Sequence, residues 1–143
     1  MSKEEGDAES RIPFLNVGGN MTVQEVLTEV DELKPHQYED SLLIGWLNNL
    51  EQRIYTQILS RYVYEEELEA YVPLTENNPE RELCIKEMYT DIYKFYLFAM
   101  IDFYNNETAR YQNSYAMYNV MYEEFANYWN RTHKHKGPHR FKV

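Results

Sequence analysis

The sequence predicts an all-α protein, a bundle of about four helices. Three observations predict this class: apolar residues recur at helical spacing in four segments, no segment alternates as a half-buried strand does, and 43% of the residues are hydrophobic. A chain of 143 residues is long enough to bury a core without disulfides or metals. We therefore expect a single helical domain over residues 21–131, a flexible N-terminal arm at 1–20 and a basic C-terminal tail at 132–143.

Capping signals and apolar stripes predict the first two helices. Thr22 and Glu25 match a capping box at the start of the first helix, and Pro35 ends it. The second helix is expected from near Asp40, whose charge suits the positive end of a helix dipole, to about Tyr62. The repeating apolar residues are Val23, Val26, Leu27, Val30 and Leu33 in the first helix and Leu43, Leu47, Leu50, Ile54 and Ile58 in the second.

The stretch between the second and third helices is predicted to be a long, exposed, acidic loop over residues 64–81. Its sequence, YEEELEAYVPLTENNPER, combines an acidic run with two prolines and paired asparagines. The acidic run lacks the spacing of an EF-hand and is more typical of a solvated surface than of a calcium or acid/base site. Loops of this length are uncommon in compact domains unless they are functional or mobile, so this loop is the first place to expect a binding surface.

Aromatic residues dominate the third and fourth helices. The third, expected from about Ile85 to Tyr104, is apolar on most sides, as is typical of a helix at the centre of a bundle or at a subunit interface. After a turn at residues 105–107, the fourth helix carries an aromatic seam in heptad register. Core packing is the first interpretation of this seam. However, 14 tyrosines exceed what a four-helix core needs, so some should face a partner, the candidates being Tyr111, Tyr115, Tyr118 and Tyr122.

The charge of −10 is unevenly distributed. Five of the 14 Lys and Arg residues lie within the last fourteen positions. The rest of the chain therefore has nine Lys and Arg residues against 24 Asp and Glu residues, a net charge of about −15. Such a body repels duplex DNA, so we expect no sequence-specific nucleic-acid binding. The basic tail is predicted to be a partner-docking arm, disordered alone, and the alternative is a solubilising tail of incidental basicity. Its candidate partner-binding residues are Arg131, Lys134, Lys136, Arg140 and Lys142.

The sequence shows no pattern for catalysis, a cofactor or a metal. It lacks paired Glu-x-x-His ligands, a nucleophile elbow and a Gly-rich phosphate loop after a strand. His133 and His135 lack a fixed third ligand, and no motif frames Cys84, which is expected to be a buried apolar residue. We therefore expect a non-enzymatic protein without a cofactor or metal. With neither a signal peptide nor a sufficiently long apolar run, it is also expected to be intracellular.

Three segments resemble small helical proteins of tailed phages and prophages of Gram-positive hosts, the head-to-tail connector or head-completion adaptor family. The similarity extends with interruptions from Met21 to His133, and it is one of helical core and turns rather than of catalytic signatures. Residues 1–20 and much of 64–83 lie outside it. The resembling segments are MTVQEVLTEVDELKP at 21–35, WLNNLEQRIY at 46–55 and IDFYNNETARYQNSYAMYNVMYEEFANYWNRTH at 101–133.

The resemblance implies a structural role in the virion. Members of the family assemble as an oligomeric ring on the portal protein and bridge it to the next connector or tail-completion component. It also implies a virion location, with the host cytoplasm before assembly, and it carries over no catalytic residue. The alternative is an intracellular protein-protein interaction or regulatory module that binds a basic partner with an acidic helical surface.

Overall fold

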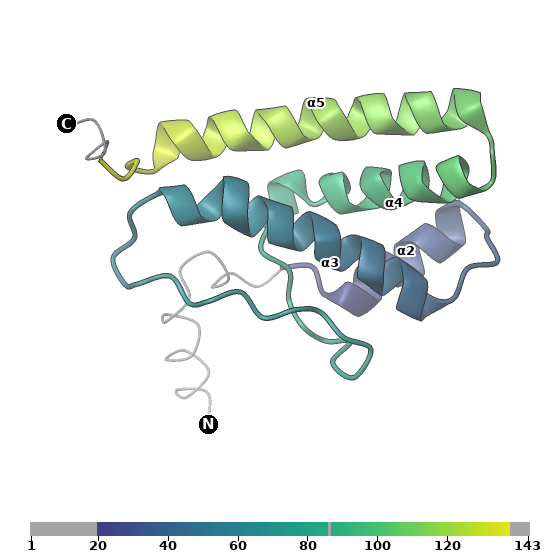
Figure 1. Cartoon of the computed structure of the whole chain (residues 1–143), viewed down its shortest axis with the longest axis horizontal. Coiled ribbons are helices and arrows are strands. Elements are labelled where there is room, and N and C mark those ends of the chain that lie inside the picture. The colour runs from purple at the N-terminus through teal and green to yellow at the C-terminus, as the bar shows by residue number, and fades with distance from the viewer. Residues whose placement is uncertain (1–19, 86, 138–143) are drawn as a thin grey trace.

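The computed structural model describes residues 20–85 and 87–137, and in this part the chain is all-α (Figure 1). No strand is present among these residues, only two isolated β-bridges. The predicted class, a bundle of about four helices, is confirmed. Residues 1–19 of the predicted N-terminal arm and residues 138–143 of the predicted tail lie outside the described part. The α-helices are α2 (Val23–Leu33), α3 (Asp40–Gln57), α4 (Asp91–Tyr104) and α5 (Thr108–Thr132).

α2 begins at the predicted capping box. The Thr22 hydroxyl accepts a hydrogen bond from the Glu25 N–H at 3.1 Å, and the Glu25 carboxylate accepts one from the Thr22 N–H at 3.0 Å. Both N–H groups would otherwise be unpaired at the helix start. The helix buries the predicted stripe as far as Val30, whereas Leu33 at its end is 58% exposed.

α3 buries its predicted apolar stripe but ends earlier than expected. Leu43, Leu47, Leu50 and Ile54 have no exposed surface. The α-helix ends at Gln57, and a 3-10 helix, Leu59–Arg61, follows before the backbone becomes extended. The apolar pattern of the sequence predicted a longer helix because Ile58 and Leu59, which follow the α-helix, are both buried.

α4 is the central helix of the bundle. It packs against α2, α3 and α5, with α5 along one side and α2 and α3 on the other (Figure 1). It begins at Asp91 rather than near Ile85, after a short 3-10 helix, Glu87–Tyr89. Ile85 is buried without being helical, so its apolar character extended the predicted helix too far. Leu83 and Cys84 just before it are also buried.

α5 runs antiparallel to α4 (Figure 1). Only one of its faces is buried. Tyr118, Phe125 and Trp129 of the predicted aromatic seam lie in the core. On other faces of the same helix, Met117 is 46% and Val120 is 51% exposed. The bundle therefore leaves much of this 25-residue helix available for contacts.

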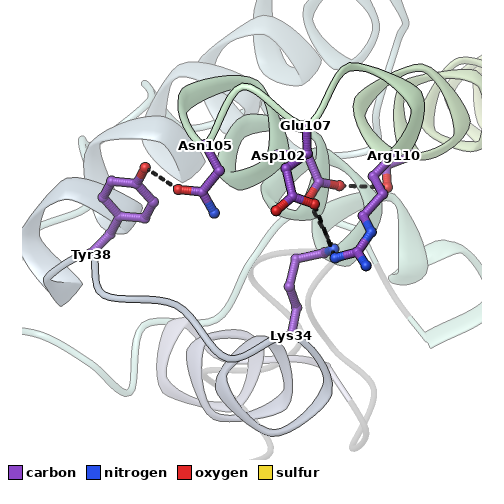
Figure 2. A network of polar contacts seen from close by, with 7 residues as sticks. Lys34, Tyr38, Asp102, Asn105, Glu107 and Arg110 are labelled. Atoms are coloured by element: carbon purple, nitrogen blue, oxygen red, sulfur yellow. Dashed lines mark hydrogen bonds and ion pairs between the residues drawn. The ribbon is translucent and has the colours of Figure 1, made fainter.

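A buried ion pair joins α2 to α4. The Lys34 ammonium lies 3.0 Å from the Asp102 carboxylate, and the Asp102 side chain is only 3% exposed (Figure 2). The second carboxylate oxygen of Asp102 accepts a hydrogen bond from the Ser114 hydroxyl of α5 at 3.4 Å. Because a buried carboxylate is costly without partners, this pair fixes the C-terminal end of α2 against the α4–α5 hairpin.

The connection between α3 and α4 is exposed but attached to the bundle. Its carbonyls at Arg81 and Pro79 accept hydrogen bonds from the N–H groups of Val23 at 3.0 Å and Gln24 at 2.8 Å, the first residues of α2. These are N–H groups that the helix itself cannot pair. Farther along, the Asn48 side-chain oxygen of α3 accepts from the Tyr71 hydroxyl at 2.7 Å and from the Leu74 N–H at 2.8 Å. The connection is thereby held at both α2 and α3.

Candidate interaction surfaces

Four aromatic residues form a patch on the α4–α5 hairpin, called here the aromatic surface: Phe103, Tyr104 and Tyr115, which are exposed, and Tyr111, which is half-buried. Phe103 and Tyr104 are each 53% exposed and Tyr115 is 38% exposed. Their rings touch in sequence, with centroids 5.0 Å apart for Phe103 and Tyr104, 5.4 Å for Phe103 and Tyr111, and 5.5 Å for Tyr111 and Tyr115. Large exposed aromatic patches of this kind mark contact sites for other proteins.

The aromatic surface rests on a well-supported turn. Trp46 of α3 stacks on Tyr104 with the ring planes only 3° apart. Beyond the end of α4, the Tyr38 hydroxyl donates to the Asn105 side-chain oxygen at 2.7 Å, as Figure 2 shows. Asn106 adopts a left-handed backbone with φ of 61°, which lets the chain reverse into α5. Because its support is fixed, the patch loses little conformational freedom when it is covered.

The other two candidate interface tyrosines lie deeper. Tyr118 is only 3% exposed, and its hydroxyl accepts a hydrogen bond from the Arg53 guanidinium at 2.7 Å. Burial raises the pKa of Tyr118 to about 12. Tyr122 is half-buried and donates to the Gln57 side-chain oxygen at 2.7 Å. Of the four predicted tyrosines, Tyr111 and Tyr115 thus belong to the surface, Tyr118 to the core and Tyr122 to its edge.

The first residues of the basic tail lie against the end of α3. The Lys134 carbonyl accepts from the Val63 N–H at 2.8 Å, and the Lys136 N–H donates to the Arg61 carbonyl at 3.0 Å. The ring of His133 stacks on the Trp129 ring, with the ring centroids 3.8 Å apart. The backbone of residues 133–136 is therefore placed on the domain, while the side chains of Arg131, Lys134 and Lys136 are exposed. Of the other predicted docking residues, Arg140 and Lys142 lie outside the described residues.

A cleft of roughly 450 Å³ opens between α3 and the connection that follows it. Two tyrosine rings, Tyr55 and Tyr71, contact each other in its wall with centroids 5.7 Å apart. Three glutamates, Glu69, Glu80 and Glu82, and a single arginine supply its charged side chains. The predicted acidic loop thus contributes most of a concave site. The remaining lining residues are Ala70, Val72, Asn78, Arg81 and Cys84.

A buried carboxyl lies directly behind this cleft. Glu51 of α3 has no exposed surface, and its Oε2 accepts hydrogen bonds from the Cys84 N–H at 2.6 Å and the Tyr93 hydroxyl at 3.0 Å. The Tyr93 hydroxyl in turn accepts from the Ile85 N–H at 2.9 Å. Burial raises the pKa of Glu51, and the hydrogen bonds with Cys84 and Tyr93 only partly oppose this shift. Glu51 and Tyr93 thereby anchor the segment that leads into α4.

Sequence reasoning missed Glu51. A signal for it exists, because Glu51 lies four residues after Leu47 and three before Ile54, within the apolar stripe of α3. A charged residue at such a position must find buried partners, and here those partners are the N–H of Cys84 and the hydroxyl of Tyr93.

Cys84 is buried, and its burial raises the pKa of the thiol well above the ordinary value, which disfavours the reactive thiolate. Residues 20–85 and 87–137 contain no group of three or more His, Cys, Asp or Glu side chains placed to hold a metal ion. Within the same ranges, no helix has the length and apolar character needed to cross a bilayer.

Comparisons of the chain with protein-family models, with curated proteins and with solved structures gave no match.

Proposed function

We propose that this protein is a non-enzymatic structural component of a tailed-phage or prophage particle, a head-to-tail connector. In this role, copies of the chain assemble as a ring on the portal protein and bridge it to a downstream connector or tail-completion protein. The observation that carries the proposal is the aromatic surface of the α4–α5 hairpin. It lies on the segment, residues 101–133, whose sequence resembles the connector family.

The aromatic surface has the properties that assembly requires. Aromatic side chains bury large areas at a small cost in rotamer freedom, and tyrosine hydroxyls find hydrogen-bond partners at the rim of an interface. Phe103 is the most apolar of the four residues and touches both Tyr104 and Tyr111. We therefore place Phe103 at the centre of a contact with a neighbouring copy or with the next component of the particle.

The charge distribution suits a component that borders a DNA channel. About −15 charges on the chain before its basic tail oppose adsorption of the passing phosphates. The exposed Arg131, Lys134 and Lys136 provide an opposite patch beside the end of α5. Complementary charge of this kind orients an approaching partner more than it adds affinity.

The proposal is tested by replacing Phe103 in the source phage or prophage. Phe103→Ser removes the central ring of an exposed patch, so helical content and melting temperature should be retained while tailed particles are lost and tailless, DNA-filled heads accumulate. The matched control is Leu33→Ser, which alters a side chain that is 58% exposed at the end of α2, outside both proposed contact surfaces. Normal tailed particles with Phe103→Ser, or equal losses with the two variants, would contradict the proposal.

A further inference from the structure

We infer that the acidic cleft beside α3 is an interaction site for a second copy of this chain and that it receives the basic segment 138–143 of that copy. The inference deepens the proposed function, since it names a contact between neighbouring copies. It concerns different residues from the aromatic surface.

The walls of the cleft are fixed in place. The Tyr55 hydroxyl donates to the Glu69 carbonyl at 2.6 Å, and the Tyr71 hydroxyl donates to Asn48 at 2.7 Å. The guanidinium of Arg81 lies over the Tyr71 ring, 5.8 Å from its centroid. The cleft thus already accommodates a cation on an aromatic face, which is the chemistry that a second Lys or Arg would use.

The charge of the cleft calls for a cationic occupant. Glu69, Glu80 and Glu82 are exposed, and Arg81 is the only basic side chain that lines the cleft with them. Behind the floor, the Glu51 carboxyl is joined to Cys84 through the Cys84 N–H. The Oε1 atom of Glu51 has no hydrogen-bond partner among the described residues. One arginine against three surface carboxylates leaves an excess of negative charge for a partner to neutralise.

The chain itself supplies a segment of the complementary chemistry. Residues 138–143 contain Arg140 and Lys142 with Phe141 between them and no acidic residue, and they follow Gly137. Just before that glycine, the Lys136 N–H is hydrogen-bonded to the Arg61 carbonyl, so the segment departs from a defined point on the domain. Six residues span up to about 20 Å when extended.

A contact between one surface of a copy and a different surface of the next is heterologous. Repeated heterologous contacts generate a closed ring when the rotation between copies closes, and an open filament when it does not. The cleft and the basic segment therefore form the two complementary ends of a repeating contact, as a ring of identical subunits needs. Because the contact joins opposite charges, it should weaken as salt is added.

The first test is cross-linking of an equal mixture of unlabelled and ¹⁵N-labelled full-length protein at about 50 mM salt, where exposed charges are weakly screened. A zero-length carbodiimide reagent couples an amine to a carboxylate in direct contact. We expect links from Lys142 to Glu69, Glu80 or Glu82 between a labelled and an unlabelled chain. If cross-links form only within chains of the same label, the basic segment occupies the cleft of its own chain. If no cross-link from the segment to the cleft forms, the segment does not occupy the cleft at all. Either result overturns the inference.

The second test is sedimentation of matched charge variants. The cleft variant E69Q/E80Q/E82Q and the control E65Q/E66Q/E67Q each remove three exposed carboxylates from the same connection, and only the first set lines the cleft. We expect self-association to weaken roughly tenfold in the cleft variant and less than threefold in the control. Equal effects would indicate non-specific charge attraction and overturn the inference. If Phe103→Ser particles are normal while these results hold, the connector proposal fails and the cleft contact stands.

Discussion

Replacing Glu51 with glutamine should change how the stability of the protein depends on pH. The glutamine carbonyl can still accept the hydrogen bonds that Glu51 accepts from the Cys84 N–H and the Tyr93 hydroxyl. It cannot ionise, whereas the carboxyl of Glu51 must either stay protonated in the core or be charged there. The comparison therefore isolates the cost of ionising this one buried group.

The sign and size of the effect follow from the pKa of Glu51. Burial raises that pKa above the ordinary value of 4.5, so between the two values the folded protein binds a proton that the unfolded chain has released. The stability that Glu51 contributes is fully present below pH 4.5 and is lost as pH rises through the folded pKa. The loss is about 1.4 kcal/mol for each unit by which the folded pKa exceeds the ordinary one.

The assay is urea unfolding of the wild type and of Glu51→Gln at several pH values from 4.5 upward. The unfolding free energy of the variant minus that of the wild type should rise with pH and level off above the folded pKa. A difference in unfolding free energy that is the same at every pH does not bear on this test, because burying the glutamine amide changes the stability by an amount that does not depend on pH. A difference that is independent of pH, or that falls as pH rises, would refute the assignment of Glu51 as a carboxyl with a raised pKa.

Substitutions at three further positions test contacts of the described fold by urea unfolding at neutral pH. Lys34→Met should destabilise the fold by about 3–5 kcal/mol, because it leaves the Asp102 carboxylate buried without its cation. A loss of unfolding free energy below about 1 kcal/mol would show that Asp102 does not depend on Lys34. Tyr93→Phe should cost about 1–3 kcal/mol through the unpaired N–H of Ile85, and an unchanged midpoint would argue against that hydrogen bond. Thr22→Ala should cost about 1 kcal/mol by removing the cap of α2, whereas Thr22→Ser, which retains the hydroxyl, should cost much less.

Local signals were sufficient to predict the helices. The start of α2 depends on Thr22 and Glu25, which lie three residues apart and cap the helix without help from the rest of the chain. The stripe of α3 was recognisable because Leu43, Leu47, Leu50 and Ile54 all face one core. Helices with this strong periodicity are determined largely by which face must be buried.

The ends of helices and the role of buried polar groups required tertiary information. The segment from Leu83 to Ile85 is buried without being helical, because the Met21 carbonyl, Glu51 and Tyr93 accept the hydrogen bonds of its N–H groups. Nothing in that segment reveals these distant partners. The four tyrosines offered as interface residues share one seam. Their separation into surface and core depends on Arg53 of α3 reaching Tyr118, a contact between residues that are 65 positions apart.

The central claim, that this protein joins heads to tails, is tested most directly by locating it in particles. Purified particles from an induced culture of the source would be labelled with a gold-conjugated antibody against the chain and examined by electron microscopy. The account predicts gold at the junction between head and tail, together with recovery of the chain by mass spectrometry from the same particles. Particles free of the chain, with all of it in a small complex with a non-virion protein, would contradict the connector and favour the regulatory module.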